Sequence, residues 1–260
     1  MTAFAGFSIL LRKELAEAWR TRRLPLVLLL FVVIGIISPL TGRYLKEILD
    51  AALGDQLPIP LPEPDAAAGL AQLVKNMGQL GAMAGIALAM GAVAGEVDRG
   101  TAALVLAQPV GRGAFLAAKA AAVGLSLAFA VGVATAIAAV YTAILFTPLA
   151  ISDWVAFGLL QWLALAAWAA LALLASSAVS SVTAAAGASF AAWIGVSLLA
   201  VVPALDRVLP TALAGLSMAV AQGIRTGDAV TYLGSAVAGS LALIATSLVG
   251  AWLIFRRRAL

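Results

Sequence analysis

The chain has 260 residues, of which 63% are hydrophobic and 11% are charged, with a formal net charge of +4. A mean hydropathy of +1.08 excludes an ordinary soluble domain. Several apolar runs are long enough to cross a bilayer core of about 30 Å, which takes roughly 20 helical residues, and closed barrels would need alternating polarity instead. The sequence therefore predicts an all-α, polytopic membrane protein. The absence of Cys and His excludes thiolate and imidazole metal sites, thiol catalysis, disulfides and histidine proton relays.

Residues 1–23 precede the first span and are predicted to form an amphipathic helix in the membrane interface. Apolar side chains recur at helical spacing, namely Phe4, Phe7, Leu11, Leu15 and Ala18. Trp19 lies beside this apolar stripe. The remaining surface is expected to carry the polar side chains, namely Arg12, Lys13, Glu14, Glu17 and Arg20. The alternatives are a signal-anchor leader, which lacks a good cleavage site here, and a disordered basic tail.

Six apolar segments are predicted to span the membrane: 24–40, 76–94, 113–147, 154–175, 184–202 and 229–255. Apart from Lys119, which opens the third, they contain no Asp, Glu, Lys or Arg in their interiors. Ion-coupled carriers usually place such groups near the membrane centre, so a proton- or sodium-driven carrier is disfavoured. Gln161 is expected to form a hydrogen bond between helices. Gly81 and Gly85 form a small-xxx-small ridge that either serves close packing or reflects the general tolerance of spans for glycine.

Two polar insertions separate spans on the side opposite the termini. Residues 41–75 are expected to form an extended, stiff loop, because prolines occupy alternate positions: Pro58, Pro60, Pro62 and Pro64. Residues 204–228 carry leucines at helical spacing but are interrupted by Pro210 and Gly215. They are expected to form a short re-entrant or interfacial pair of helices.

The distribution of basic residues predicts the orientation. With both termini in the cytoplasm, 11 of the 16 Lys and Arg residues lie inside and 5 lie outside. This bias follows the positive-inside rule, so both termini and residues 95–119 are predicted to be cytoplasmic. The pI near 9.9 is then a signal of topology, and no nucleic-acid partner is expected.

Residues 95–119 form a charged interval between two spans, with Glu96, Asp98, Arg99, Arg112 and Lys119. Within it, residues 100–107 have the pattern of a short helix lying flat at the membrane surface. Gly100 permits a tight entry, Thr101 is expected to cap the helix, and Pro109 is expected to end it. Arg112 and Lys119 are expected at the membrane surface. The simpler alternative is an ordinary cytoplasmic turn with solvated charges.

Motifs for catalysis are lacking in the sequence. It has no conspicuous carboxylate pair, aspartate-rich motif, Gly-rich phosphate loop or Ser-Lys dyad. No catalytic residue, cofactor or metal site is therefore expected on this chain, and any energy it uses must come from a partner.

The chain resembles the permeases of type-two ABC transporters. The resemblance rests on the six spans, on Lys13, Glu14 and Leu15 in the amino-terminal helix, and on one short motif: Glu96, Asp98, Arg99, Gly100, Thr101, Leu104, Pro109, Arg112 and Lys119. In that family the first cytoplasmic loop is a coupling helix that docks on a separate ATP-hydrolysing subunit. The resemblance implies that residues 95–112 have this role and that the amino-terminal helix supports them.

The resemblance also implies partners and a location. Two ATP-binding-cassette subunits would hold ATP and Mg, a second permease copy or homologue would complete the path, and the complex would lie in the inner membrane of a prokaryote. Export of a lipid, a drug or a peptide and a role in copper-site maturation all stay open. The alternative is a structural or regulatory membrane subunit that transports nothing.

Overall fold

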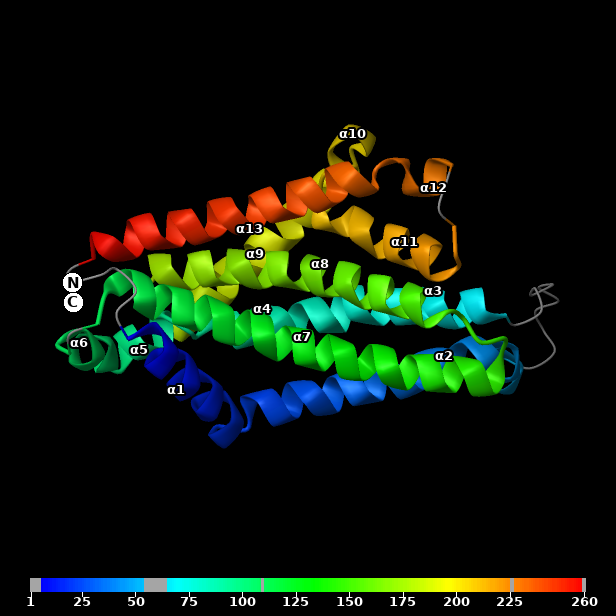
Figure 1. Ribbon diagram of the computed structural model, residues 1–260, viewed down its shortest axis with the longest axis horizontal. Helices are drawn as coiled ribbons and strands as arrows, with labels where there is room; N and C mark the ends of the chain where they lie inside the picture. The colour runs from blue at the N-terminus through cyan, green and yellow to red at the C-terminus, as the bar shows by residue number, and fades with distance from the viewer. Residues whose placement is uncertain (1–5, 54–64, 109, 225–226, 259–260) are drawn as a thin grey trace.

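The computed structural model describes all residues except 1–5, 54–64, 109, 225–226 and 259–260. The described part is helical and contains no strand, and its long helices run side by side along the molecule (Figure 1). Six stretches are long and apolar enough to cross a membrane, which confirms the predicted all-α, six-span architecture. They are α2 (Arg23–Leu53), a run from α3 (Ala66–Asn76) through η2 (Met77–Gly81) and α4 (Ala82–Met90) to α5 (Ala94–Asp98), α7 (Arg112–Leu145), α8 (Ile151–Ala178), α9 (Val182–Leu199) and α13 (Leu233–Arg256).

Shorter helices lie at the two ends of this bundle. One end holds α1 (Phe7–Arg20), α6 (Thr101–Leu106) and the last turn of α13 (Figure 1). The other half holds α10 (Pro203–Asp206), α11 (Pro210–Ala221) and α12 (Asp228–Thr231). Elements far apart in the sequence therefore meet at the end where α6 lies.

The helix α8 is the centre of the packing. It contacts α4, α7, α9, α11 and α13, because it is apolar around most of its circumference and buries residues from Trp154 to Ser177. Large buried side chains around it include Phe31 and Leu127. In contrast, α9 and α13 bury little of their surface within this chain. Such helices face lipid or another subunit.

The predicted packing role of the Gly81–Gly85 ridge is confirmed. A methyl group at Gly81 would lie 3.2 Å from a side-chain carbon of Leu165 and 3.3 Å from the ring of Phe31. At Gly85 it would contact Leu127 and the backbone of Leu165 at 3.5 Å. These glycines let the second span approach α2, α7 and α8 closely.

The expected loop over 41–75 is wrong for most of its length. The first spanning helix continues to Leu53, and α3 begins at Ala66, where the Asp65 carboxylate accepts a hydrogen bond from the Ala68 amide at 2.9 Å. Both extensions are rich in good helix formers, and α3 buries Leu70 and Leu73. The four alternating prolines lie outside the described residues.

Residues 204–228 contain the expected pair of helices, α10 and α11. Pro203 and Pro210 each open a helix, where a missing amide hydrogen costs nothing. The longer helix, α11, packs against α8, α3 and α13. Gln161 of α8 donates a buried hydrogen bond to the Ser217 hydroxyl of α11 at 2.8 Å, which confirms its predicted role.

Candidate functional site

The candidate site lies where α1, α5, α6 and the first turns of α7 meet. Its centre is an ion pair between Lys119 of α7 and Glu96 of α5, with Nζ and Oε1 2.8 Å apart. Both side chains are buried, with exposures of 2% and 5%. Lys119 is therefore enclosed by protein rather than exposed: it sits two turns inside α7, and α1 packs over it. Its location at the membrane surface stays a prediction.

The amino-terminal helix α1 supplies the remaining charges around this pair. Lys119 Nζ also donates to Glu14 at 3.0 Å, and Lys13 Nζ donates to Glu96 at 2.8 Å and to Glu14 at 3.1 Å. Glu17 lies 3.3 Å from Lys13 and 4.0 Å from Arg99. We call this set the ionic cluster: Lys13, Glu14, Glu17, Glu96, Arg99 and Lys119. Three acids face three bases, so the cluster is neutral.

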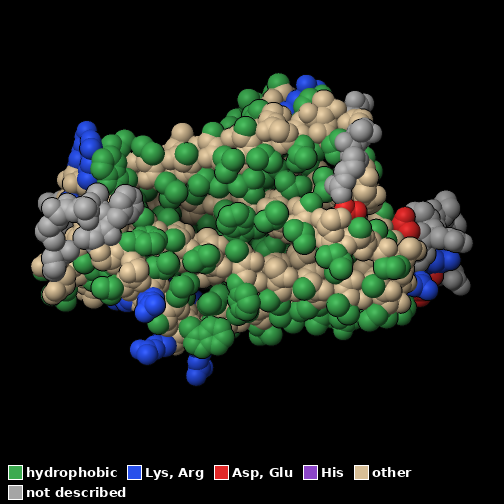
Figure 2. Space-filling view, viewed as in Figure 1, with side chains coloured by type: hydrophobic (Ala, Val, Ile, Leu, Met, Phe, Trp, Pro, Cys, Tyr) green, Lys and Arg blue, Asp and Glu red, His purple; other side chains and the backbone are tan. Residues whose placement is uncertain are grey.

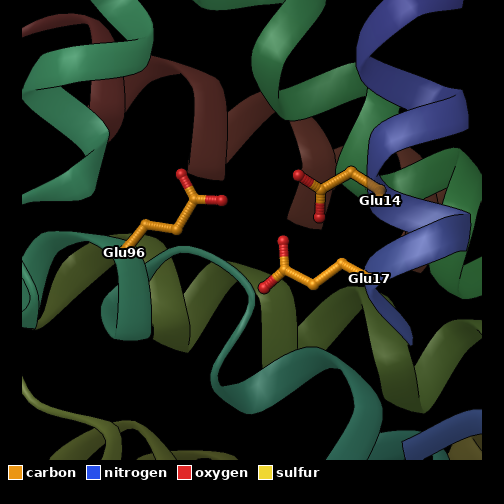
Figure 3. A group of neighbouring side chains, drawn as sticks. All are labelled: Glu14, Glu17 and Glu96. Carbon is orange, nitrogen blue, oxygen red and sulfur yellow. The ribbon is translucent and has the colours of Figure 1, made fainter. Parts of the chain in front are cut away.

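The three glutamates of the ionic cluster point toward one another from α1 and α5 (Figure 3). One carboxylate oxygen from each lies within 4.8 Å of the others, the spacing of a metal site. However, the lysine ammonium groups already bind these carboxylates. A metal ion would have to displace them, so the arrangement acts as a structural junction between helices.

Lys13 remains charged in this setting. Burial works to lower the pKa of Lys13, but the hydrogen bond to Glu96 and the neighbouring Glu14 carboxylate outweigh it and raise the pKa above its ordinary value. Lys13 is therefore a permanent cation at neutral pH. It keeps α1 attached to α5 by charge as well as by packing.

The amino-terminal helix is amphipathic, but its inner face is more polar than predicted. Leu10 is buried, and Phe7, Leu11 and Leu15 are partly buried. Glu14, which the sequence placed on the outer surface, turns inward with 13% of its side chain exposed. Outer positions include Arg12 and Trp19. The expectation for Phe4 lies outside the described residues, and a location in the membrane interface stays a prediction.

The segment between α5 and α7 presents a short helix outward. Gly100 opens α6 with a φ of +70°, a conformation that L side chains rarely adopt. Thr101 does not cap α6 as expected; its hydroxyl instead donates back to the Glu96 carbonyl at 3.2 Å, holding the turn to the ionic cluster. Ala102 is buried, whereas Leu104 is 71% exposed. Asp98 and Arg99 are exposed beside it, and Pro109 lies outside the described residues.

Arg112 has a different role from the predicted headgroup anchor. Its Nη1 donates to the carbonyl oxygens of Phe255 at 3.4 Å, Arg256 at 2.8 Å and Arg258 at 3.0 Å. These carbonyls belong to the end of α13, where helical partners run out and a cation opposes the negative end of the helix dipole. Arg112 therefore joins the start of α7 to the end of α13.

The structure shows two further sets of hydrogen bonds that the sequence did not predict. Ser176 of α8 accepts hydrogen bonds from the amides of Val93 and Ala94 at 3.1 and 3.0 Å, where the second span breaks before α5. Arg258 donates to the carbonyls of Ser177 and Val179 at the end of α8. The basic end of the chain looked like a topology signal, and a serine in a span carries no sign of its partner.

Comparison with known proteins places this geometry in context. Residues 8–223 match the family described as ABC-2 family transporter protein. An uncharacterized transmembrane protein of Bacillus subtilis (strain 168), YxlG, is 29% identical over 112 residues. These residues make up 42% of this chain and 43% of that protein, so the match spans less than half of the relative's length.

Proposed function

Because the chain belongs to the ABC-2 transporter family, we propose that it is the membrane-spanning permease subunit of an ABC transporter, moved by separate ATP-hydrolysing subunits that contact residues 95–112. ATP and Mg would bind to those subunits. The observation that carries the proposal is the ionic cluster around the buried Glu96–Lys119 pair, which holds one face of this segment to α1 and α7 while α6 projects from the other. The chain itself would have no catalytic role.

The contacts of the segment explain how a push on α6 would reach the spans. Glu96 connects it to α7 through Lys119 and to α1 through Lys13. Arg112 connects the start of α7 to the end of α13, and Ser176 connects α8 to the start of α5. Three spans are thus attached to one short segment. A displacement of α6 would move their ends together, because packed interiors transmit strain.

The outward side of α6 is suited to a protein partner. Leu104 is 71% exposed, Ala103 is exposed on the same short helix, and Ala107 is exposed directly after it. Leu106, in contrast, packs against the core of the chain. An apolar side chain flanked by Asp98 and Arg99 matches the usual interface of an apolar centre with a polar rim. We infer that Leu104 enters the partner, while Leu106 supports α6 from below.

The basic bias supports an orientation in which α1, α6 and both termini lie on the cytoplasmic side, and the membrane would be the inner membrane of a prokaryote. Two ATP-hydrolysing subunits and a second permease copy or homologue would complete the transporter. Its substrate would be an exported lipid, drug or other amphipathic molecule, because the described spans offer apolar surface and few charges.

The test is to copurify the complex and measure its ATP hydrolysis with a panel of lipids and drugs. Gly100→Val should keep the complex assembled but abolish the response to substrate, because a β-branched residue resists the left-handed turn that orients α6. Gly100→Asn is the matched control, since Asn tolerates this conformation. A chain with no ATP-hydrolysing partner, or with hydrolysis that ignores every substrate and both variants, would favour a non-transporting structural or regulatory subunit.

A further inference from the structure

An apolar groove runs along the face of the bundle that α1, α7, α8 and α13 share, in the half nearest α6. We call it the inner groove; it has a volume of about 710 Å³. Its residues include Phe7, Leu11, Ala121, Gly124, Ala166 and Leu248. Figure 2 shows many hydrophobic side chains across the middle of this face, with most of the charged ones at its edges. The volume is typical of a small-ligand site.

The sequence explains why the groove is hollow. The facing sides of α7 and α8 carry small residues there, such as Ala121, Gly124 and Ala166, whereas α13 and α1 contribute large ones, such as Leu248 and Phe7. Large walls around a floor of small side chains leave a space that this chain does not fill. An exposed hollow among spanning helices must be filled by lipid or protein, because water is absent from the bilayer core.

The groove ends near the middle of the membrane. There the Trp162 indole of α8 donates a hydrogen bond to the Gly124 carbonyl of α7 at 2.9 Å. Trp162 also borders a second apolar hollow, of about 600 Å³, that continues toward the opposite surface. The two hollows thus meet at Trp162, about 16 Å from the start of α8. Each hollow extends from one side of the membrane to its middle. This length matches that of an acyl chain in one leaflet.

One basic residue follows a residue of the groove wall directly in the sequence. Phe7 and Leu11 of α1 form part of its wall, and the exposed Arg12 follows directly on α1. Cationic side chains near a membrane surface attract anionic lipid headgroups. The occupant should therefore combine an apolar chain with a negative head, a description that fits a phospholipid better than a helix of a second copy.

We propose that the inner groove binds one acyl chain of an anionic phospholipid from the leaflet that α1 faces, with the headgroup near Arg12. The bound chain would fill the space between α1 and the spans and would hold α1, and with it the ionic cluster, in place. The choice of leaflet rests on the proposed orientation. The ATP-hydrolysing partner is not needed for binding, so the proposal is tested without it.

Bromine quenches tryptophan fluorescence on contact, and Trp162 borders the groove. The full-length chain is reconstituted in vesicles of unlabelled phosphatidylcholine. Increasing amounts of one brominated lipid are added, either phosphatidylglycerol or phosphatidylcholine with brominated acyl chains. Subtracting the signal of Trp162→Phe isolates Trp162. Brominated phosphatidylglycerol should reach half-maximal quenching at a mole fraction about fivefold lower than brominated phosphatidylcholine, the effect of about one cation near the headgroup.

Two variants and their control separate the parts of the proposal. Ala121→Phe fills the groove and should remove the preference, whereas Ala245→Phe, on the exposed surface of α13 outside the groove, should retain it. Arg12→Gln leaves the groove intact and should reduce the preference for phosphatidylglycerol alone. Equal quenching of the native chain by both lipids overturns the proposal. A second result would also overturn it: both lipids quench the native chain only weakly, and Ala121→Phe loses self-association. A second copy of the chain would then occupy the groove.

Discussion

Lys119 Nζ and Glu96 Oε1 lie 2.8 Å apart in the interior, although their helices are separated by the whole of α6 and its flanking turns. A buried pair of this kind is costly to break, because the remaining charge has been removed from water without its partner. The pair therefore fixes the position of residues 95–112 relative to α7. Its neighbours Lys13 and Glu14 extend the same constraint to α1.

The Glu96–Lys119 pair should show strong energetic coupling. Glu96→Leu leaves the buried Lys119 with Glu14 as its partner, and Lys119→Met leaves the buried Glu96 with Lys13 as its partner. Each single variant should therefore lower the free energy of unfolding by at most about 3–5 kcal/mol. The double variant Glu96→Leu/Lys119→Met should cost less than either, because Lys13 and Glu14 can still pair. Unfolding in detergent measures all three. Additive losses would show that the two residues do not interact.

Glu14 and Glu17 provide a comparison within one helix. Glu14 is 13% exposed and pairs with the buried Lys119, whereas Glu17 is 34% exposed and pairs with Lys13 and Arg99 near the surface. Glu14→Gln should therefore destabilise the chain clearly, and Glu17→Gln should cost at most about 1 kcal/mol, as exposed pairs do. Thermal unfolding of the purified chain measures both. Equal effects would contradict the asymmetric burial.

Arg112 should hold the end of α13. Arg112→Gln removes a cation that donates to three carbonyl groups and should release the last turn of α13, at a cost of about 1.5–3 kcal/mol. Hydrogen exchange of the amides near Phe255 and Arg256 should then accelerate. Arg99→Gln, which removes an exposed arginine at the same end of the bundle, should leave that exchange unchanged. Equal exchange rates at the end of α13 in the two variants would contradict this role of Arg112.

The orientation can be read by labelling, because the native chain has no cysteine. Ala204→Cys, which is exposed on α10, should react with an impermeant maleimide from outside intact cells. Ala107→Cys, which is exposed after α6, should react only after the membrane is opened. The reverse pattern would invert the proposed topology.

The sequence predicted the spans and the general position of the candidate site, because hydropathy and charge position are local properties. The six spans and the short helix near residues 100–107 were found in this way. The contacts of Arg112 and Lys119 could not be predicted, since their partners lie up to 146 residues away and depend on packing. Both were assigned to the membrane surface because single charges at the ends of spans usually lie there.

Polar composition also misled the reading of two helices. Residues 41–53 and 66–75 carry enough charge or polarity to look like loops, yet their helix propensity and the burial of Leu70 and Leu73 extend the spans. Glu14 was placed on the solvent side of α1 because it is charged, although Leu10, one turn before it, is buried. Its buried partner Lys119 lies 105 residues away in the sequence, so the sequence of α1 does not contain the charge with which Glu14 pairs.

Cysteine cross-linking tests the central claim, that α6 is the surface on which an ATP-hydrolysing partner acts. Leu104→Cys, exposed on α6, should cross-link to that partner in the assembled complex. Leu106→Cys, which lies on the same helix but packs inward, should not. Cross-links at Leu104 and none at Leu106 are the predicted result. No cross-link at either position, in a complex whose partner is present and active, would contradict the account.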